Sequence, residues 1–175
     1  MKTILALLAA ITLAGPATAQ DPRLQGRLDA ATLRSVTAYI DSSRSDGIPA
    51  EPLVQKALEG VSKGAPGNRI LVAVRNLGAT MRTARSALDP ASSDREIVAG
   101  AAALRAGAAP EGLRSLRRAR GSSNLEVPLA VLADLVGLGM QVEMAYQSVL
   151  DLARNQAADE EFIRLKQRRL EGSRP

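Results

Sequence analysis

Apolar side chains recur along this chain at intervals of three and four residues, the spacing that places them on one face of an α-helix. The longest such series has steps of 4, 3, 4, 3 and 4 residues and consists of Ile70, Val74, Leu77, Met81, Ala84 and Leu88. We therefore predict an amphipathic helix over about 67–88. It should end before Asp89 and Pro90, because a proline disfavours helical backbone in the residue that precedes it.

Weaker patterns of the same kind predict two helices before this one. The first is indicated by the apolar spacing of Leu33, Val36 and Ile40. It would begin earlier if Leu24 and Leu28 belong to the same series. The polar segment 42–47 is expected to end this helix. A short helix should follow from Pro49 to about Gly64, since proline suits the first helical position and glycine commonly follows the last turn.

Five further helices are predicted after residue 88. Ser93 and Glu96 have the spacing of a capping box, in which the two residues satisfy each other's backbone N–H groups at the start of a helix. That helix should end at Gly107, and Pro110 should open the next, which ends near Gly121. The remaining apolar series predict helices over about 129–137, 142–152 and 159–170.

Glycines precede many of these helices, and the chain also matches itself weakly at an offset of 92 residues. The offset aligns Gly47 with Gly139, Glu51 with Glu143, Gln55 with Gln147 and Leu58 with Leu150. This match predicts duplicated helical hairpins around 47–88 and 139–170, as in stacked helical repeats. The alternative is a chance match, which any chain rich in alanine and leucine will produce.

No segment alternates apolar and polar residues over several positions, so no sheet is predicted. The predicted fold is all-α, with about seven to eight short helices in an irregular helical bundle or a short α-solenoid. The low aromatic content, 2%, implies a core made of Ala, Leu, Val and Ile. Residues 20–175 are expected to form a single domain.

The first nineteen residues have the layout of a bacterial Sec-type signal peptide. Lys2 provides a positive charge, residues 4–14 are uncharged and mostly apolar, and a Gly-Pro pair then interrupts the apolar run. We predict a signal peptide over 1–19 with cleavage between Ala19 and Gln20. A membrane anchor is disfavoured, because a spanning helix needs ~20 apolar residues.

The predicted location of the mature protein is therefore the periplasm or the extracellular medium. A lipoprotein is excluded, because the chain has no cysteine to acylate. Without cysteine the fold must also rest on packing rather than on disulfides. The most apolar later segment, 127–140, is too short to span a membrane and contains Asp134. No transmembrane segment is expected in the mature chain.

The residue types present exclude many forms of catalysis. With neither histidine nor cysteine, Ser-His-Asp and Cys-His arrangements and the usual zinc ligands are missing. We predict no catalytic residue, no cofactor and no metal. A hydrolase that uses two carboxylates, drawn from Asp134, Glu143 and Asp151, is the enzymatic alternative. We expect these carboxylates to be solvent-facing helix charges instead.

Basic residues outnumber acidic ones and give a formal net charge of +5, and most of them are arginine. The residues that stand out are in one predicted helix: Arg114, Arg117, Arg118 and Arg120. They could bind an anionic component of the cell envelope, such as a lipid headgroup, lipopolysaccharide or an acidic glycan. The alternative is a solvated helix face with internal partners, of which Glu111 is one for Arg114. Nucleic acid is not expected, because aromatic stacking residues are absent.

These observations favour a non-enzymatic function. We expect a helical module of the periplasm that binds a protein or peptide partner in the cell envelope. This hypothesis predicts an apolar groove or patch on the surface. Anion binding through the arginine segment 114–120 is the second hypothesis, and a carboxylate-based hydrolase is the third.

Overall fold

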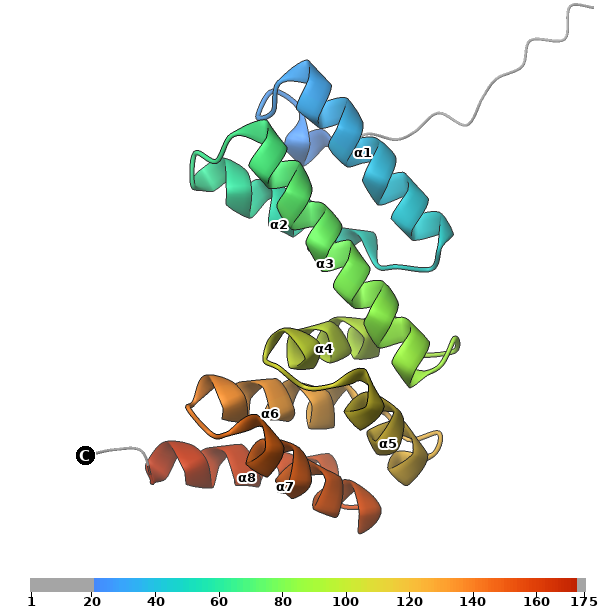
Figure 1. Cartoon of the computed structure of the whole chain (residues 1–175), viewed down its shortest axis with the longest axis vertical. Helices are drawn as coiled ribbons and strands as arrows, with labels where there is room; N and C mark the ends of the chain where they lie inside the picture. The colour runs from blue at the N-terminus through green and yellow to red at the C-terminus, as the bar shows by residue number, and fades with distance from the viewer. Residues whose placement is uncertain (1–20, 173–175) are drawn as a thin grey trace, which may run out of the picture.

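The computed structural model describes residues 21–172. Within this range the chain forms eight α-helices and one 3₁₀ turn without any strand, which confirms the all-α prediction (Figure 1). The predicted signal peptide over 1–19 and its cleavage position between Ala19 and Gln20 lie outside the described residues. The elements are η1 (Pro22–Leu24), α1 (Ala30–Ser45), α2 (Ala50–Ser62), α3 (Gly67–Leu88), α4 (Asp94–Arg105), α5 (Pro110–Arg120), α6 (Glu126–Gly137), α7 (Val142–Arg154) and α8 (Asp159–Glu171).

The first helix ends within the predicted segment 42–47, but its expected extension back to Leu24 and Leu28 is wrong. α1 begins at Ala30, because the Asp29 carboxylate accepts hydrogen bonds from the N–H groups of Ala31 and Thr32 and so caps the helix there. Leu24 belongs to the separate turn η1. At its other end α1 continues through the polar segment to Ser45, since Ser43 is fully buried against α3 and accepts a hydrogen bond from Arg82.

The capping box of α4 is present as predicted. Ser93 N–H donates to the Glu96 carboxylate at 2.9 Å, and Glu96 N–H donates to Ser93 Oγ at 3.3 Å. Gly78, an interior glycine of α3, allows close approach to α1. A Cβ at that position would lie 2.3 Å from the Tyr39 hydroxyl oxygen. That hydroxyl donates to the Arg75 carbonyl and accepts from Arg82.

Five of the seven links between the described helices are the same four-residue turn. In each, one residue has a positive φ, and the residue after it donates its N–H to the carbonyl five positions earlier. The donor–acceptor pairs are Ile48 and Ser43, Ala65 and Gly60, Ala108 and Ala103, Met140 and Leu135, and Ala157 and Leu152. Four of these turns use the glycines predicted to end helices, and the fifth uses Gln156, whose φ is 51°.

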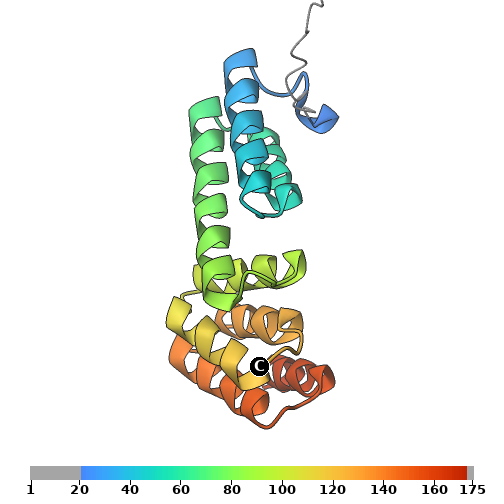
Figure 2. The ribbon, with the colours of Figure 1, turned by 90° about the vertical axis from the view of Figure 1, so that its right-hand side faces the viewer.

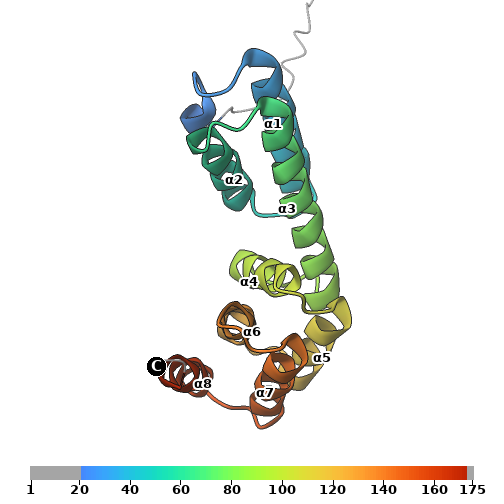
Figure 3. The ribbon, with the colours of Figure 1, turned by 60° about the vertical axis from the view of Figure 1, so that its left-hand side comes forward.

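Helices two apart in the chain lie side by side in two rows (Figure 3). α4, α6 and α8 form one row, and α3, α5 and α7 form the other. The long helix α3 runs along one side of the molecule and connects the N-terminal helices α1 and α2 to the helices that follow it (Figure 2). α2 packs on η1, α1 and α3 instead of continuing the row of α4, α6 and α8.

The core consists mainly of leucine, alanine, valine and isoleucine side chains, as the composition predicted. Phe162 of α8 is the one aromatic side chain fully buried among the described residues. No helix in residues 21–172 combines the length and apolar character needed to cross a membrane.

Candidate binding groove and the arginine segment

A groove of about 500 Å³ lies between the start of α2 and the row that begins with α4 and α6. The groove exists because α2 does not continue that row. The side of α4 that faces away from α6 therefore has no helix packed along it. The lining residues are Pro49, Glu51 and Pro52 of the α2 end, Asp94, Arg95, Val98, Ala99 and Ala102 of α4, and Glu126, Ala130, Ala133 and Asp134 of α6.

The floor of the groove is apolar and made of small side chains. Val98 and Ala102 are one helical turn apart on α4, and Ala130 and Ala133 occupy one face of α6. Val98 is 39% exposed and is one of five large apolar side chains that face solvent among the described residues. Such a floor offers apolar area without large side chains that would fill the groove.

Five charged side chains also line the groove, and four of them are acidic. Glu51 accepts two hydrogen bonds from the Arg23 guanidinium, at 2.8 and 2.6 Å. Asp134 pairs with Lys166 of α8 at 3.0 Å. Glu126 has one contact with Arg95, at 3.8 Å.

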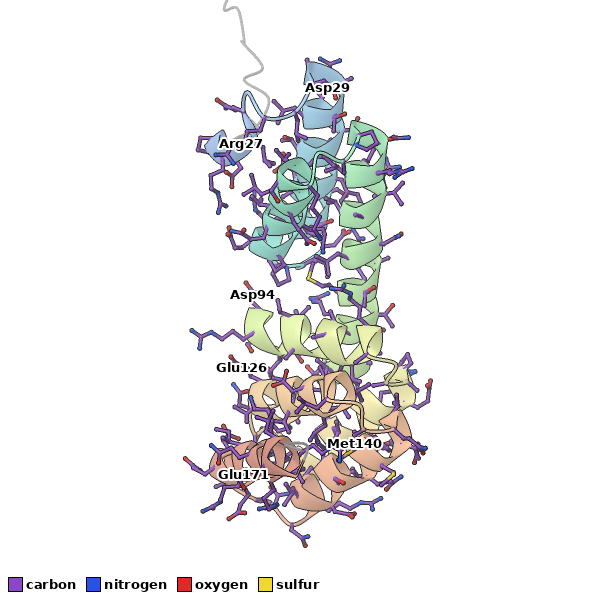
Figure 4. All side chains as sticks on the ribbon, turned by 90° about the vertical axis from the view of Figure 1, so that its left-hand side faces the viewer. Arg27, Asp29, Asp94, Glu126, Met140 and Glu171 are labelled. Atoms are coloured by element: carbon purple, nitrogen blue, oxygen red, sulfur yellow. The ribbon has the colours of Figure 1, made fainter. Side chains whose placement is uncertain are left out.

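The four acids therefore differ in how fully their charge is balanced. Hydrogen bonds from Arg23 and then from Gln55 lower the pKa of Glu51 to about 2, so this carboxylate is ionised at neutral pH. Asp94 has no ion-pair partner among the described residues. Asp94 and Glu126 are the first residues of α4 and α6 and lie at the same end of the groove (Figure 4).

The arginine segment singled out in the sequence divides into two internal and two surface side chains. Arg117 donates to the Glu96 carboxylate at 2.5 Å and to the carbonyls of Gly121 and Ser123. Glu96 is only 6% exposed and also accepts the N–H of Leu125. Burial raises the pKa of Glu96, but hydrogen bonds from Ser93, Arg117 and Leu125 outweigh it and leave the pKa below its ordinary value.

Arg120 is buried as well, at 9% exposure. It donates to the carbonyls of Ala157 and Asn124 and to the Asp159 carboxylate, and its guanidinium lies 5.4 Å from the Phe162 ring centre. The side chain thus connects α5 to the turn before α8 and to α8 itself. Its two terminal nitrogens are therefore engaged with the fold, while Nε is buried without a hydrogen-bond partner among the described residues.

The other two arginines of the segment remain on the surface. Arg114 pairs with Glu111 at 3.0 Å, the internal partner predicted from the sequence. Arg118 donates to Ser115 Oγ at 2.9 Å. An anion that approached α5 from solvent would meet Arg114 and Arg118, while Arg117 and Arg120 are engaged with other elements.

The three carboxylates considered for hydrolysis each have their own neighbour. Asp134 pairs with Lys166, Glu143 accepts from Gln147 at 2.7 Å, and Asp151 lies 3.7 Å from Arg154. No group of three metal-ligating side chains occurs among residues 21–172.

The leading hypothesis predicted an apolar groove or patch on the surface, but the sequence did not indicate its position. Val98 was the only available indication, since it falls outside the apolar face formed by Ile97, Ala101 and Leu104. Searches for this chain among protein-family models, curated proteins and solved structures found no match to support a family assignment.

Proposed function

We propose that this protein is an exported, short α-solenoid that binds a segment of another protein in the groove between α2 and α4. The observation that carries the proposal is the apolar groove where α2 leaves the row of stacked helices. Stacked helical repeats commonly use such surfaces for binding. A partly apolar pocket of this size, with a few polar groups at its edge, is typical of binding sites.

The N-terminal sequence supports the location. The pattern of residues 1–19 is that of a signal peptide, which would deliver the domain to the periplasm or beyond. A partner in the cell envelope is then the expected one. The rigid connections made by the repeated turns would hold the groove in one shape, which lowers the entropy lost on binding.

The test is selection of binding peptides from a random library displayed on phage. Three proteins are compared: the unmodified domain, Ala102→Trp, which fills the groove, and Val72→Trp, which adds the same ring elsewhere. Ala102 lines the groove, whereas Val72 is 55% exposed on α3 and outside it. We expect selected peptides to bind the domain and the Val72→Trp variant alike, and to lose at least about tenfold in affinity on Ala102→Trp.

Two results would overturn the proposal. One is the absence of any enriched peptide, or equal binding of enriched peptides to both tryptophan variants. The other is a dimer of the unmodified domain that Ala102→Trp converts to a monomer in sedimentation measurements. In that case the groove would be occupied by a second copy of this chain.

A further inference from the structure

We infer that the groove selects a cationic segment, in which a lysine or arginine side chain is followed by apolar side chains. The inference rests on the proposed function and specifies the chemistry of the partner. Its basis is charge: the chain as a whole carries +5, yet four carboxylates and a single arginine line this groove. A local excess of acid on a basic protein favours a positively charged ligand.

The carboxylates that can meet such a ligand are Asp94 and Glu126. Glu51 is held by the two hydrogen bonds from Arg23, and Asp134 is paired with Lys166. Asp94 lacks an ion-pair partner within residues 21–172. In the same part of the chain, Glu126 pairs only with Arg95, whose side chain is 81% exposed and 3.8 Å away, so their attraction is weakened by water.

The geometry also fixes an orientation for the ligand. Asp94 and Glu126 stand at the starts of two adjacent helices, so both carboxylates lie at one end of the groove (Figure 4). The apolar floor extends from that end along α4 and α6, past Val98 and Ala130. A basic side chain at the acidic end would therefore place the following residues of the same segment on the floor. These residues should be apolar, to match the floor.

The test uses synthetic peptides of one composition in three versions, with Lys, Gln or Glu at the first position and Ala and Val after it. Binding to the full domain is measured at low and at high salt. We expect the Lys version to bind about tenfold more tightly than the Gln version at low salt, with the difference shrinking as salt is added. The Glu version should bind most weakly.

Two sets of variants assign the effect to its residues. Asp94→Asn combined with Glu126→Gln should abolish the difference between the Lys and Gln versions, since neither carboxylate accepts a side-chain hydrogen bond that the fold needs. Glu143→Gln is the control for the loss of a surface carboxylate elsewhere: Glu143 is an exposed acid of α7 outside the groove, and its replacement should leave the difference intact. Circular dichroism checks that each variant remains helical.

The outcomes separate this inference from the proposed function. If all three versions bind equally and all lose affinity on Ala102→Trp, the groove binds peptides but does not select charge, and the inference is wrong. If no version binds, or Ala102→Trp has no effect, the proposed function itself fails. If Glu143→Gln removes the charge preference as effectively as the double variant, the preference comes from overall charge and the inference is again wrong.

Discussion

The hairpins α2–α3 and α7–α8 share the same turn, and their helices begin at equivalent positions, but the two helices of each hairpin pack differently. Adding 92 to the bounds of α2 gives those of α7, and the first residue of α3 then becomes the first residue of α8. Both pairs are joined by the same hydrogen-bonded turn. Nevertheless α3 packs closely along α2, whereas α8 turns away from α7 and packs on α6 (Figure 3).

A single position explains much of the difference. Gly60 of α2 faces α3 so closely that a Cβ there would lie 2.7 Å from Ile70 Cγ1. The corresponding residue of α7 is Leu152, and a leucine cannot allow that approach. The turn therefore determines how two helices are connected, while the side chains on their faces determine which neighbour each helix packs against. Whether the two hairpins arose by duplication stays a prediction.

The largest effect that we expect comes from removing the contacts between α5 and α8, which lie outside the α7–α8 hairpin. Arg120→Ala removes a buried guanidinium that satisfies two carbonyls and pairs with Asp159. We expect the free energy of unfolding to fall by about 3 kcal/mol, mainly because two carbonyls lose their hydrogen-bond donor; Asp159 is 43% exposed and can be solvated. Hydrogen exchange of amides in α8 should accelerate, while exchange in α2 and α3 stays unchanged.

The matched control for this change is Arg118→Ala, two residues earlier on α5, where the side chain is exposed. It should alter the unfolding free energy by less than about 0.5 kcal/mol. If Arg120→Ala accelerates exchange equally in both hairpins, α8 depends on Arg120 no more than α2 and α3 do, and the contrast between the two ends of the molecule is lost.

The second prediction places the leucine of α7 in α2. Gly60→Leu forces a side chain into space occupied by Ile70, which costs up to about 3 kcal/mol, and the better helix propensity of leucine returns about 1. We expect a net loss of about 2 kcal/mol in the unfolding free energy, measured by urea denaturation. Ile70→Ala should be destabilising alone but should partly rescue Gly60→Leu, because it vacates that space. Additive effects of the two changes would contradict a direct contact.

The third prediction tests whether the turns of the two hairpins are equivalent. Gln156→Ala and Gln156→Gly both remove the side-chain hydrogen bonds to the carbonyls of Ala119 and Ala153. They differ only in their tolerance of the positive φ, so the glycine variant should be more stable by about 1 kcal/mol. Gly64→Ala should cost a similar amount, because nothing lies within 4 Å of a Cβ there. If the alanine and glycine forms differ in stability by unequal amounts at positions 156 and 64, the two turns are not equivalent.

Sequence patterns predicted the local structure well, because helix ends depend on nearby residues. The bounds of α3 and the capping box of α4 follow from residues within one helical turn. The start of α1 was placed too early, because the apolar spacing continues back through Leu28 and Leu24 although Asp29 caps the helix. Local signals of glycine and capping residues therefore carry most of the secondary structure, whereas the packing of helices depends on contacts distant in the chain.

The candidate site was harder to predict for the same reason. The groove exists because of where α2 packs, and its alanines look like ordinary helix formers in the sequence. The arginine segment was conspicuous in the sequence, but the local pattern could reveal only Glu111 as a partner. The partners of Arg117 and Arg120 lie on other elements, so their internal role could not be derived from spacing.

The smallest effect concerns the exposed acids of α2. Hydrogen bonds from Lys56 and then from Lys63 lower the pKa of Glu59 to about 2. The positions of these two lysines correspond to Ser148 and Asn155 in the second hairpin, so α7 has no such arrangement. Because folding lowers the pKa of Glu59, its stabilising contribution is complete above the unfolded value of about 4.5 and is lost as the pH falls toward about 2.

An NMR titration of the side-chain carboxyl carbons measures this pKa directly. We expect Lys56→Gln to raise the pKa of Glu59 toward 4.5, and Lys63→Gln to raise it less, in the order of their contributions. Added salt should also raise the pKa of Glu59, because it screens the attraction between exposed charges. If neither lysine variant changes the pKa of Glu59, these ion pairs do not form in solution. The difference between α2 and α7 would then be one of sequence only.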